Sequence, residues 1–438
     1  MGYYSVLPSF LIVVAVLALA YLSPFRLVEA KSSSPEKRVA ALDGLRGFLA
    51  LAVLLHHGAL YHTYMSNHEW VSPHDRIFGL IGQFGVSMFF MVTGFLFWSQ
   101  VLVVEGRVKF VRLYVGRLFR IGPLYLFATA GMFFAVMLAS GFRLREDAAT
   151  IAQELLSWSA LGLWVNSPVN GLAHAGDFLA NVVWSLRWEW FFYASLIVTA
   201  PLARFRLGGW LTPTLGLTVA LSMLAAQGHW VQGGQRAALV ALFCVGMSAA
   251  AFRRAVWTID FEAPIFSGLA LAAASSVFWV GDTIYAVVPI VLLATAFFIV
   301  ANGGTLFGVL MTRSARRLGD ISFGIYLLHG LVLAAVFSTA PVRALAESSP
   351  WTHWALVGFG AMVSVCLSAI VHVIIEQPAI TIGRRVGRSM EAMAGTLTRS
   401  RSPLFSDSIS PPVPQGATTT LVNGLARDLI PDNIRVGD

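Results

Sequence analysis

Charged residues are scarce in this sequence of 438 amino acids. Asp, Glu, Lys and Arg together make up 12% of it, whereas 57% is hydrophobic. A soluble domain carries about 25% charged residues, so this composition excludes an ordinary water-soluble protein. It also excludes an intrinsically disordered chain, which needs low hydrophobicity and high net charge. Apolar windows of about the 20 residues that cross a bilayer recur along the chain. We therefore predict an all-α, polytopic transmembrane helix bundle.

Cysteines and metal-binding patterns are also sparse. Cys244 and Cys366 lie alone in apolar stretches, which excludes a disulfide framework or a thiolate metal site. His62, His68 and His74 are irregularly spaced without an HExxH-like pattern, so we expect no metal. The net charge of +8 comes without basic runs interleaved with aromatics, and we expect no nucleic-acid partner. Basic residues of membrane proteins gather in cytoplasmic loops, where membrane lipid is the expected partner.

Hydrophobic windows and loop charges together predict the topology. The apolar segment 3–22 is followed, not preceded, by basic residues, which is typical of an uncleaved signal anchor with its N-terminus outside. Ten further windows lie at 40–61, 77–99, 121–141, 182–203, 208–227, 236–252, 264–281, 284–302, 321–339 and 353–375. Every second loop between windows is basic. The sequence thus predicts about 11 spans in a cytoplasmic (inner) membrane, one N-terminal span plus a ten-helix core, with the C-terminus inside.

Three regions follow from these windows. Residues 1–38 are predicted to form the signal-anchor helix and a cytoplasmic linker, residues 39–380 the membrane core, and residues 381–438 a mostly disordered cytoplasmic tail. The connection 142–181 is long, and its apolar piece is too short to cross a bilayer, which favours an interfacial or re-entrant helix. Pro378 is expected to end the last span, because proline lacks a backbone N–H.

Titratable residues inside a predicted span are costly and are candidates for function. Arg46 and His57 are eleven residues apart, which places both on one helix face about 16 Å apart. Asp43 falls near that face, whereas His56 points away from it. Arg46 could simply snorkel to the cytoplasmic surface, with His57 at the outer interface. The shared face favours a functional interpretation, in which His57 is a general base on a hydroxyl and Arg46 binds an anion.

Two other segments carry weaker patterns. Arg117 and Arg120, at i and i+3, share a helix face at the cytoplasmic surface and could clamp phosphates, although ordinary positive-inside charge explains them as well. Gly85 and Gly94 would permit close approach between helix backbones.

The later predicted spans also carry aromatic and polar residues. Glu189 lies near the outer end of a span, where it could orient an imidazole or bind sugar hydroxyls. Trp184 and Trp188 beside it could stack on a sugar, or belong to an aromatic belt. His329 lies about two turns into a late span, either as a second polar group of the same cavity or as a structural hydrogen-bond partner.

In this order, these segments resemble the acyltransferase-3 family of integral membrane acyltransferases. The matching motifs are Leu42-Asp-Gly-Leu-Arg-Gly47 with its Arg-(ten residues)-His pair, Gly-x-x-x-Phe-Phe-x-x-x-Gly-Phe from Gly85, Arg-x-x-Arg with Pro123-Leu-Tyr125, Trp-Ser-Leu-x-x-Glu, and Gly-x-Ile-Ser-x-x-Ile-Tyr-Leu-x-His. Five motifs in register, over residues 38–380, are a specific signal. Ser87 stands where many members have Asp, and Thr93 replaces the usual Ser, which leaves the acceptor open.

The resemblance implies an O-acyltransferase that moves an acetyl (acyl) group from cytoplasmic acetyl-CoA to a hydroxyl of a surface or lipid-linked carbohydrate. Acetyl-CoA would be the donor co-substrate, and a carbohydrate or glycolipid the acceptor. The implied catalytic residues are His57, Arg46 and Glu189. The implied donor-binding residues are Arg117, Arg120 and Tyr125, and the implied acceptor-binding residues are Trp184, Ser185, Trp188 and His329.

Several alternatives stay open at this point. Intramembrane Arg, His and Glu also suit a proton-coupled transporter or flippase of a glycan or lipid precursor, although the sequence lacks the repeated halves common in transporters. Direct transfer with His57 as base and a covalent acyl-enzyme are both possible. His56 or His329 could share the catalytic role. The sequence does not define the acceptor, the acyl length or the oligomeric state.

Overall fold

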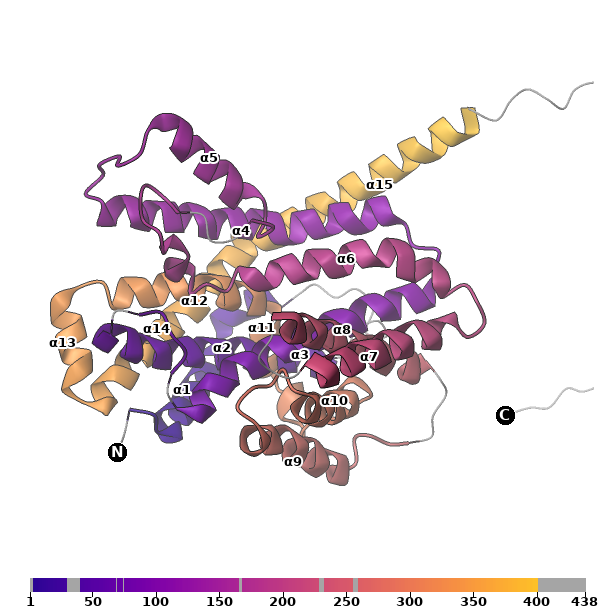
Figure 1. Cartoon of the computed structure of the whole chain (residues 1–438), viewed down its shortest axis with the longest axis horizontal. Helices are drawn as coiled ribbons and strands as arrows, with labels where there is room; N and C mark the ends of the chain where they lie inside the picture. Colours follow the sequence, from indigo (N-terminus) through magenta and orange to yellow (C-terminus); the bar gives the residue numbers. More distant parts are fainter. Residues whose placement is uncertain are drawn as a thin grey trace, which may run out of the picture. The chain divides into compact units, whose positions relative to one another are not determined.

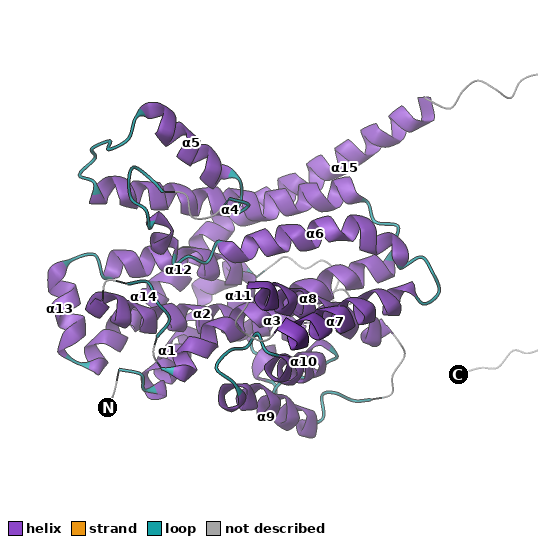
Figure 2. Ribbon diagram, in the orientation of Figure 1, coloured by secondary structure: helices purple, strands orange, loops and turns teal. Residues whose placement is uncertain are grey.

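The computed structural model describes residues 3–29, 40–67, 69–73, 75–164, 168–227, 232–254 and 259–400. The regular elements of these residues are helices, with no strand among them, which confirms the predicted all-α class (Figure 2). Contacts divide the chain into residues 1–392, which hold both cavities described below, and residues 393–438. Residues 30–39 of the predicted linker, His68 and His74, and residues 401–438 of the predicted tail lie outside the described residues.

Each of the ten predicted windows coincides with a helix (Figure 1). These helices are α2 (Ala40–Asn67), α3 (Arg76–Val103), α4 (Phe110–Ala139), α6 (Trp184–Leu202), α7 (Gly208–Gln227), α8 (Gln232–Arg254), α9 (Pro264–Val280), α10 (Val287–Ala301), α12 (Ser322–Val336) and α14 (Pro350–Val371). The N-terminal apolar segment forms α1 (Val6–Tyr21). The other elements are η1 (Ser23–Val28), α5 (Ala148–Ser159), η3 (Ala175–Leu179), η4 (Val309–Met311), α11 (Arg313–Asp320), α13 (Ala340–Ser348), η5 (His372–Glu376) and α15 (Gln377–Ser400).

Six of the described helices are long and apolar enough to cross a membrane. They are α2, α3, α4, α7, α8 and the α14–α15 helix. The pair α11–α12, bent by 71°, makes a seventh if it is one span, and α1, α9 and α10 are apolar but shorter. Helix length and composition therefore support a polytopic membrane protein, whereas fewer helices pass this test than the predicted count of about 11 spans.

Helices α3 and α8 cross with their backbones in contact. A Cβ atom on Gly94 would lie 2.2 Å from the Phe243 carbonyl oxygen, and one on Gly246 would lie 2.0 Å from the Met91 carbonyl oxygen. Gly85 lies on a different face of α3 and packs in the same manner on α2. Small residues are needed where helices approach so closely, which confirms the close approach predicted for Gly85 and Gly94. These contacts fix α3 between α2 and α8, and α3 lines both cavities.

Polar contacts hold the described residues of the long connection, 142–164 and 168–181, in place. Its helix α5 begins after Asp147, whose carboxylate accepts hydrogen bonds from the backbone N–H groups of Ala149 and Thr150. The buried Glu154 carboxylate accepts from the Asn170 N–H at 2.9 Å, and the Asn170 amide donates to the Arg143 carbonyl. The connection is thus tied to the end of α4, and it returns as η3 beside the small cavity.

Arg317 of α11 caps the C-terminal end of α1. It is 3% exposed, and its guanidinium donates to the carbonyls of Ala20, Tyr21 and Leu22 as well as to Glu29. The last carbonyls of a helix have no partner within the helix, and a guanidinium can satisfy several at once. The sequence pattern counted Arg317 among ordinary loop cations; its burial shows that it joins α1 to the core.

We expect Arg317→Ala to lower the free energy of unfolding by about 1–3 kcal/mol, because it leaves buried carbonyls of α1 without a donor. Thermal unfolding of the purified protein in detergent measures this effect. Arg316→Ala is the matched control, because Arg316 precedes Arg317 in the same helix and is exposed. Equal stability of the two variants would contradict the capping role.

Pro378 does not end the helix, which corrects the sequence-based prediction. Residues His372–Glu376 form a π-helical turn, and α15 continues directly from Gln377 to Ser400. In an α-helix the proline ring would clash with the carbonyl of residue 374, and the wider π-turn relieves such crowding. The predicted tail boundary at residue 381 accordingly falls inside α15.

Candidate functional site

A large cavity of about 940 Å³ lies among α2, α3, α4, α6, α12 and the α14–α15 helix. Its volume falls in the range typical of sites for small-molecule ligands. Seven of its lining residues are cationic: Arg46, Arg107, Lys109, Arg112, Arg117, Arg120 and Arg384. Three are acidic: Asp43, Glu189 and Asp320. This imbalance suits a multiply charged anion.

The cations differ in how deeply they lie. Arg107, Arg112 and Arg384 are exposed, and Lys109 forms an ion pair with Glu391. Arg46, Arg117 and Arg120 are partly buried, farther inside the cavity. An anion entering the cavity would therefore meet the exposed cations first, and those at the inner end afterwards.

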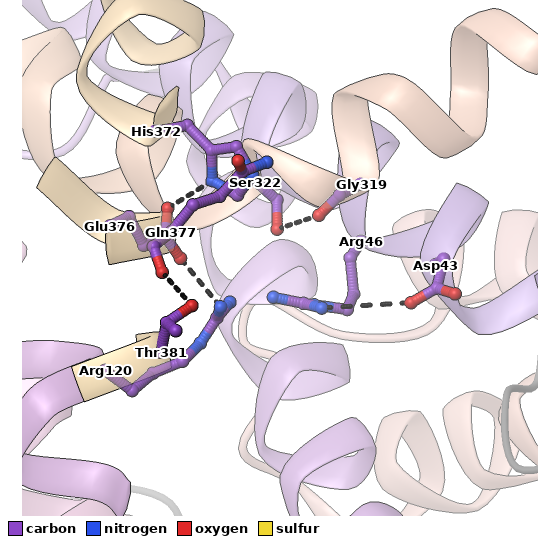
Figure 3. Close-up of polar contacts among 9 residues, drawn as sticks. All are labelled: Asp43, Arg46, Arg120, Gly319, Ser322, His372, Glu376, Gln377 and Thr381. Carbon is purple, nitrogen blue, oxygen red and sulfur yellow. Dashed lines mark hydrogen bonds and ion pairs between the residues drawn. The ribbon is translucent and has the colours of Figure 1, made fainter. Parts of the chain in front are cut away.

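Arg120 is held by an ion pair within the wall of the large cavity. Its Nη1 lies 2.8 Å from Glu376 Oε1, and His372 Nδ1 lies 2.7 Å from Glu376 Oε2. The π-turn places His372 and Glu376 so that both face this network. Figure 3 shows Arg46, paired with Asp43 at 3.9 Å, pointing toward Arg120 from the opposite side. Two guanidinium groups thus face the same space, Arg120 paired with Glu376 and Arg46 with Asp43.

Arg117 and Glu189 also face the large cavity. The Arg117 guanidinium lies 4.6 Å from the centre of the Phe97 ring, within the range of a cation–π contact. Tyr193 donates from its hydroxyl to Glu189 Oε2 at 2.7 Å, and Tyr114 donates to the Tyr193 carbonyl. Glu189 therefore lies with the cations of the large cavity and not beside His57, where it could have oriented an imidazole or bound sugar hydroxyls.

A second, smaller cavity of about 240 Å³ contains His57. Its lining comes from α2, α3, α12, the loop after η3, the first turn of α6 and the segments that precede α3 and α10. Trp70 and Trp184 contribute aromatic faces, and Gln83 contributes an amide. The Gln83 Oε1 atom accepts from Thr283 and from the Ile284 N–H, which fixes the loop before α10.

The hydrogen bonds around His57 define its tautomer. His57 Nδ1 lies 2.9 Å from the Val53 carbonyl oxygen, and His329 Nδ1 lies 2.9 Å from the Ile325 carbonyl oxygen. A carbonyl only accepts, so Nδ1 carries the proton in both neutral rings. His329 Nε2 is then an acceptor, and it lies 3.0 Å from His57 Nδ1. This arrangement leaves the lone pair of His57 on Nε2, available to accept a proton.

Two acceptors face the Nδ1 side of the His57 ring. His329 Nε2 and the Val53 carbonyl both accept from Nδ1–H. Ala180 adopts a left-handed conformation in the loop after η3. Beside it, the Asn181 amide donates to Asp177, and burial raises the pKa of the Asp177 carboxyl.

The remaining predicted site residues divide into two groups. Trp184 lines the small cavity, Ser185 lines the large one, and His329 is fully buried behind His57. Trp188 and Tyr125 line neither cavity: Trp188 packs edge to face on the exposed Phe191, and Tyr125 is buried in helix packing. Their expected contacts with acceptor and donor do not fit this placement.

The sequence-based prediction missed several residues of the two cavities. Trp70, Gln83, Tyr326 and His372 carry no signal that distinguishes them from interface aromatics or from polar groups of a span. Tyr326 lies within a quoted motif, three residues before His329, but only its position between the cavities gives it significance.

Comparison with protein families identifies the chain. A family model described as an acyltransferase domain, Acyl_transf_3, matches residues 39–373. The chain therefore belongs to the acyltransferase-3 family, as the motifs predicted, and is a membrane acyltransferase. Comparison with curated proteins and comparison with solved structures gave no match.

Proposed function

We propose that this protein transfers an acetyl group from acetyl-CoA, bound in the large cavity, to a hydroxyl of a surface or lipid-linked carbohydrate that enters the small cavity. One observation carries the proposal: a cation-lined cavity and a histidine-lined cavity lie along the same helix, α2, which supplies Arg46 to the first and His57 to the second. The large cavity then faces the cytoplasm. The basic alternate loops support about 11 spans in the cytoplasmic membrane, with the N-terminus outside and the C-terminus inside.

Charge supports the placement of acetyl-CoA in the large cavity. CoA carries several phosphate groups, and Arg107, Arg112 and Arg384 are exposed cations at the large cavity. Guanidinium groups bind phosphate with charge-assisted, often paired hydrogen bonds. Arg117 and Arg46, farther inside, would meet the more deeply placed part of the donor.

The acceptor end rests on the composition of the small cavity. Trp70 and Trp184 offer faces for a sugar ring, and Gln83 and His56 add polar groups to the same wall. Only a limited part of a glycan can enter about 240 Å³, which suits one hydroxyl-bearing ring presented from outside.

The chemistry is direct transfer with His57 as general base. The acceptor hydroxyl gives its proton to His57 Nε2 while its oxygen attacks the thioester carbonyl carbon. The carbon–sulfur bond then breaks, and the leaving thiolate takes the proton from His57. An ester and free CoA result, and His57 returns to its neutral form. His329 and the Val53 carbonyl accept from Nδ1–H throughout.

Acetyl transfer tests this proposal as a whole. The purified protein in detergent is supplied with labelled acetyl-CoA and extracted surface glycans, and we expect label to appear on the glycan fraction. A protein that neither binds nor consumes acetyl-CoA would instead favour a transporter or flippase of a glycan or lipid precursor.

We expect Arg112→Gln combined with Arg384→Gln to weaken acetyl-CoA binding about tenfold, because two charge-assisted phosphate contacts are lost. Binding of acetyl-pantetheine, which lacks the nucleotide, should not change. Isothermal titration with both ligands measures the difference. Arg385→Gln is the matched control, because Arg385 is exposed beside Arg384 but does not line the cavity. Unchanged acetyl-CoA affinity in the double variant would refute this placement of the phosphates.

A further inference from the structure

The two cavities approach each other at one point in the bundle. Among the described residues, only Val86 of α3 and Tyr326 of α12 line both of them. The wall between the cavities is therefore thin at these two side chains. The cation-lined space and the His57 cavity therefore adjoin at these two side chains.

The boundary lies at one level across the bundle. Along α2, the large cavity is lined as far as Arg46, and the small cavity begins at Val53. At the start of α6, Trp184 lines the small cavity and the next residue, Ser185, lines the large one. Tyr326 on α12 faces this same level. A shared level on separate helices indicates a single partition across one passage, not two unrelated hollows.

Tyr326 is held across that passage by hydrogen bonds to α6 and the residues before it. Its hydroxyl lies 2.8 Å from Ser185 Oγ and donates to the Val182 carbonyl at 3.1 Å. Ser185 Oγ lies 3.0 Å from the same carbonyl. The Phe89 ring meets the Tyr326 ring edge to face, with centroids 5.8 Å apart. The tyrosine thus forms a crossbar from α12 to the first turn of α6.

We propose that Tyr326 is the partition between the donor cavity and His57, and that its ring determines which acyl groups reach the histidine. The inference rests on the proposed function, in which the thioester is made in the cytoplasm and the acceptor arrives from the opposite side. Of the two substrates, only an acyl group on a slender arm can pass a gap of one side chain. Beyond Tyr326 the acyl group shares a small cavity with the acceptor hydroxyl, so a short acyl chain is selected.

A labelling experiment tests the partition without any donor. Cys244 and Cys366 are replaced with alanine, and Val53→Cys places a thiol in the wall of the small cavity. A membrane-impermeant thiosulfonate is added to sealed vesicles in which Gln100→Cys, in the large cavity, reacts readily. With Tyr326 present we expect slow labelling of Val53→Cys, and with Tyr326→Ala labelling about tenfold faster or more. Equal rates in the two backgrounds would overturn the partition.

Ser185→Ala provides a milder second variant. It removes one hydrogen bond from the crossbar and keeps the tyrosine ring, so it should raise the labelling rate of Val53→Cys by a smaller factor than Tyr326→Ala. Gln100→Cys should react at the same rate in every background. If Tyr326→Ala does not fold, this variant decides the outcome, and an unchanged rate would count against the crossbar.

A comparison of donors with different acyl chain lengths tests whether Tyr326 selects short acyl groups. Turnover of acetyl-, butyryl- and hexanoyl-CoA is compared for the wild type, Tyr326→Phe and Tyr326→Ala. We expect Tyr326→Ala to raise the ratio of hexanoyl to acetyl kcat/KM about tenfold or more, because the alanine leaves room that the ring fills. Tyr326→Phe keeps the ring and should keep the wild-type ratio. The same ratio in all three proteins would overturn the selection, whereas failure of the wild type to consume any acyl-CoA would refute the proposed function and leave the labelling result to decide the partition.

Discussion

Replacing His57 with glutamine should lower acetyl transfer about 10³-fold or more, while acetyl-CoA still binds with wild-type affinity. The reason is the tautomer that the structure defines. Because Nδ1 faces the Val53 carbonyl and His329 Nε2, the ring presents the Nε2 lone pair as the proton acceptor. Glutamine has a similar size and forms hydrogen bonds, but it cannot take up a proton at neutral pH. The loss should therefore fall on kcat and not on binding of the donor.

His56→Gln is the matched control for this measurement. His56 lines the same cavity one residue earlier in the chain, but its Nδ1 lies 2.6 Å from the Phe78 carbonyl and its ring packs against Gly82. We expect its replacement to change kcat within about fivefold. Single-turnover transfer and equilibrium binding of acetyl-CoA, measured on both variants, separate chemistry from affinity. Full activity of His57→Gln together with an inactive His56→Gln would move the base to His56.

The second large effect is expected at His329, which touches neither cavity and acts through His57. His329→Leu should lower kcat about 10²-fold with the KM for acetyl-CoA unchanged, because the imidazolium formed on His57 loses an acceptor for its Nδ1–H. The Val53 carbonyl alone then holds this proton. His329→Gln should recover much of the loss, because its side-chain carbonyl can accept where Nε2 accepts in the native protein.

The comparison of leucine and glutamine at position 329 distinguishes positioning from packing. Both substitutions remove a fully buried imidazole, so a purely structural role would lower stability and activity together in both proteins. Thermal unfolding and steady-state kinetics on the same samples reveal which applies. Equal kcat in the two variants would mean that the hydrogen bond between the histidines contributes nothing to turnover.

The helices could be predicted from the sequence because lipid imposes two simple requirements. Each span has to satisfy its own backbone hydrogen bonds, which a helix does, and its side chains have to form an apolar run of sufficient length. All ten predicted windows correspond to helices, and the close backbone approach at Gly94 follows from its lack of a side chain. The span count was harder, since α9 and α10 are shorter than a full crossing and α11–α12 is bent. A hydropathy profile contains no information on where a helix bends.

The partners of the site residues could not be predicted, because they come from distant parts of the chain. His329 and His57 are separated by 272 residues, and no local pattern indicates that their rings meet. Arg120 looked free to bind phosphate, but Glu376 on the α14–α15 helix pairs with it. Trp188 shares its segment with Trp184, yet it lies one turn further along α6 and lines neither cavity. A sequence pattern shows which residues share a helix face, but it does not show which residues that face contacts.

The π-turn at His372–Glu376 has a consequence for how this part of the chain is compared with its relatives. A π-turn holds one residue more than the α-helical turn it replaces, so every side chain beyond it is rotated by about 100° relative to the pattern of α14. A heptad or hydrophobic-moment analysis carried through from α14 into α15 will therefore be out of phase by one position. A relative that lacks this extra residue would present a different face of its last helix to Arg120, even with every other residue identical.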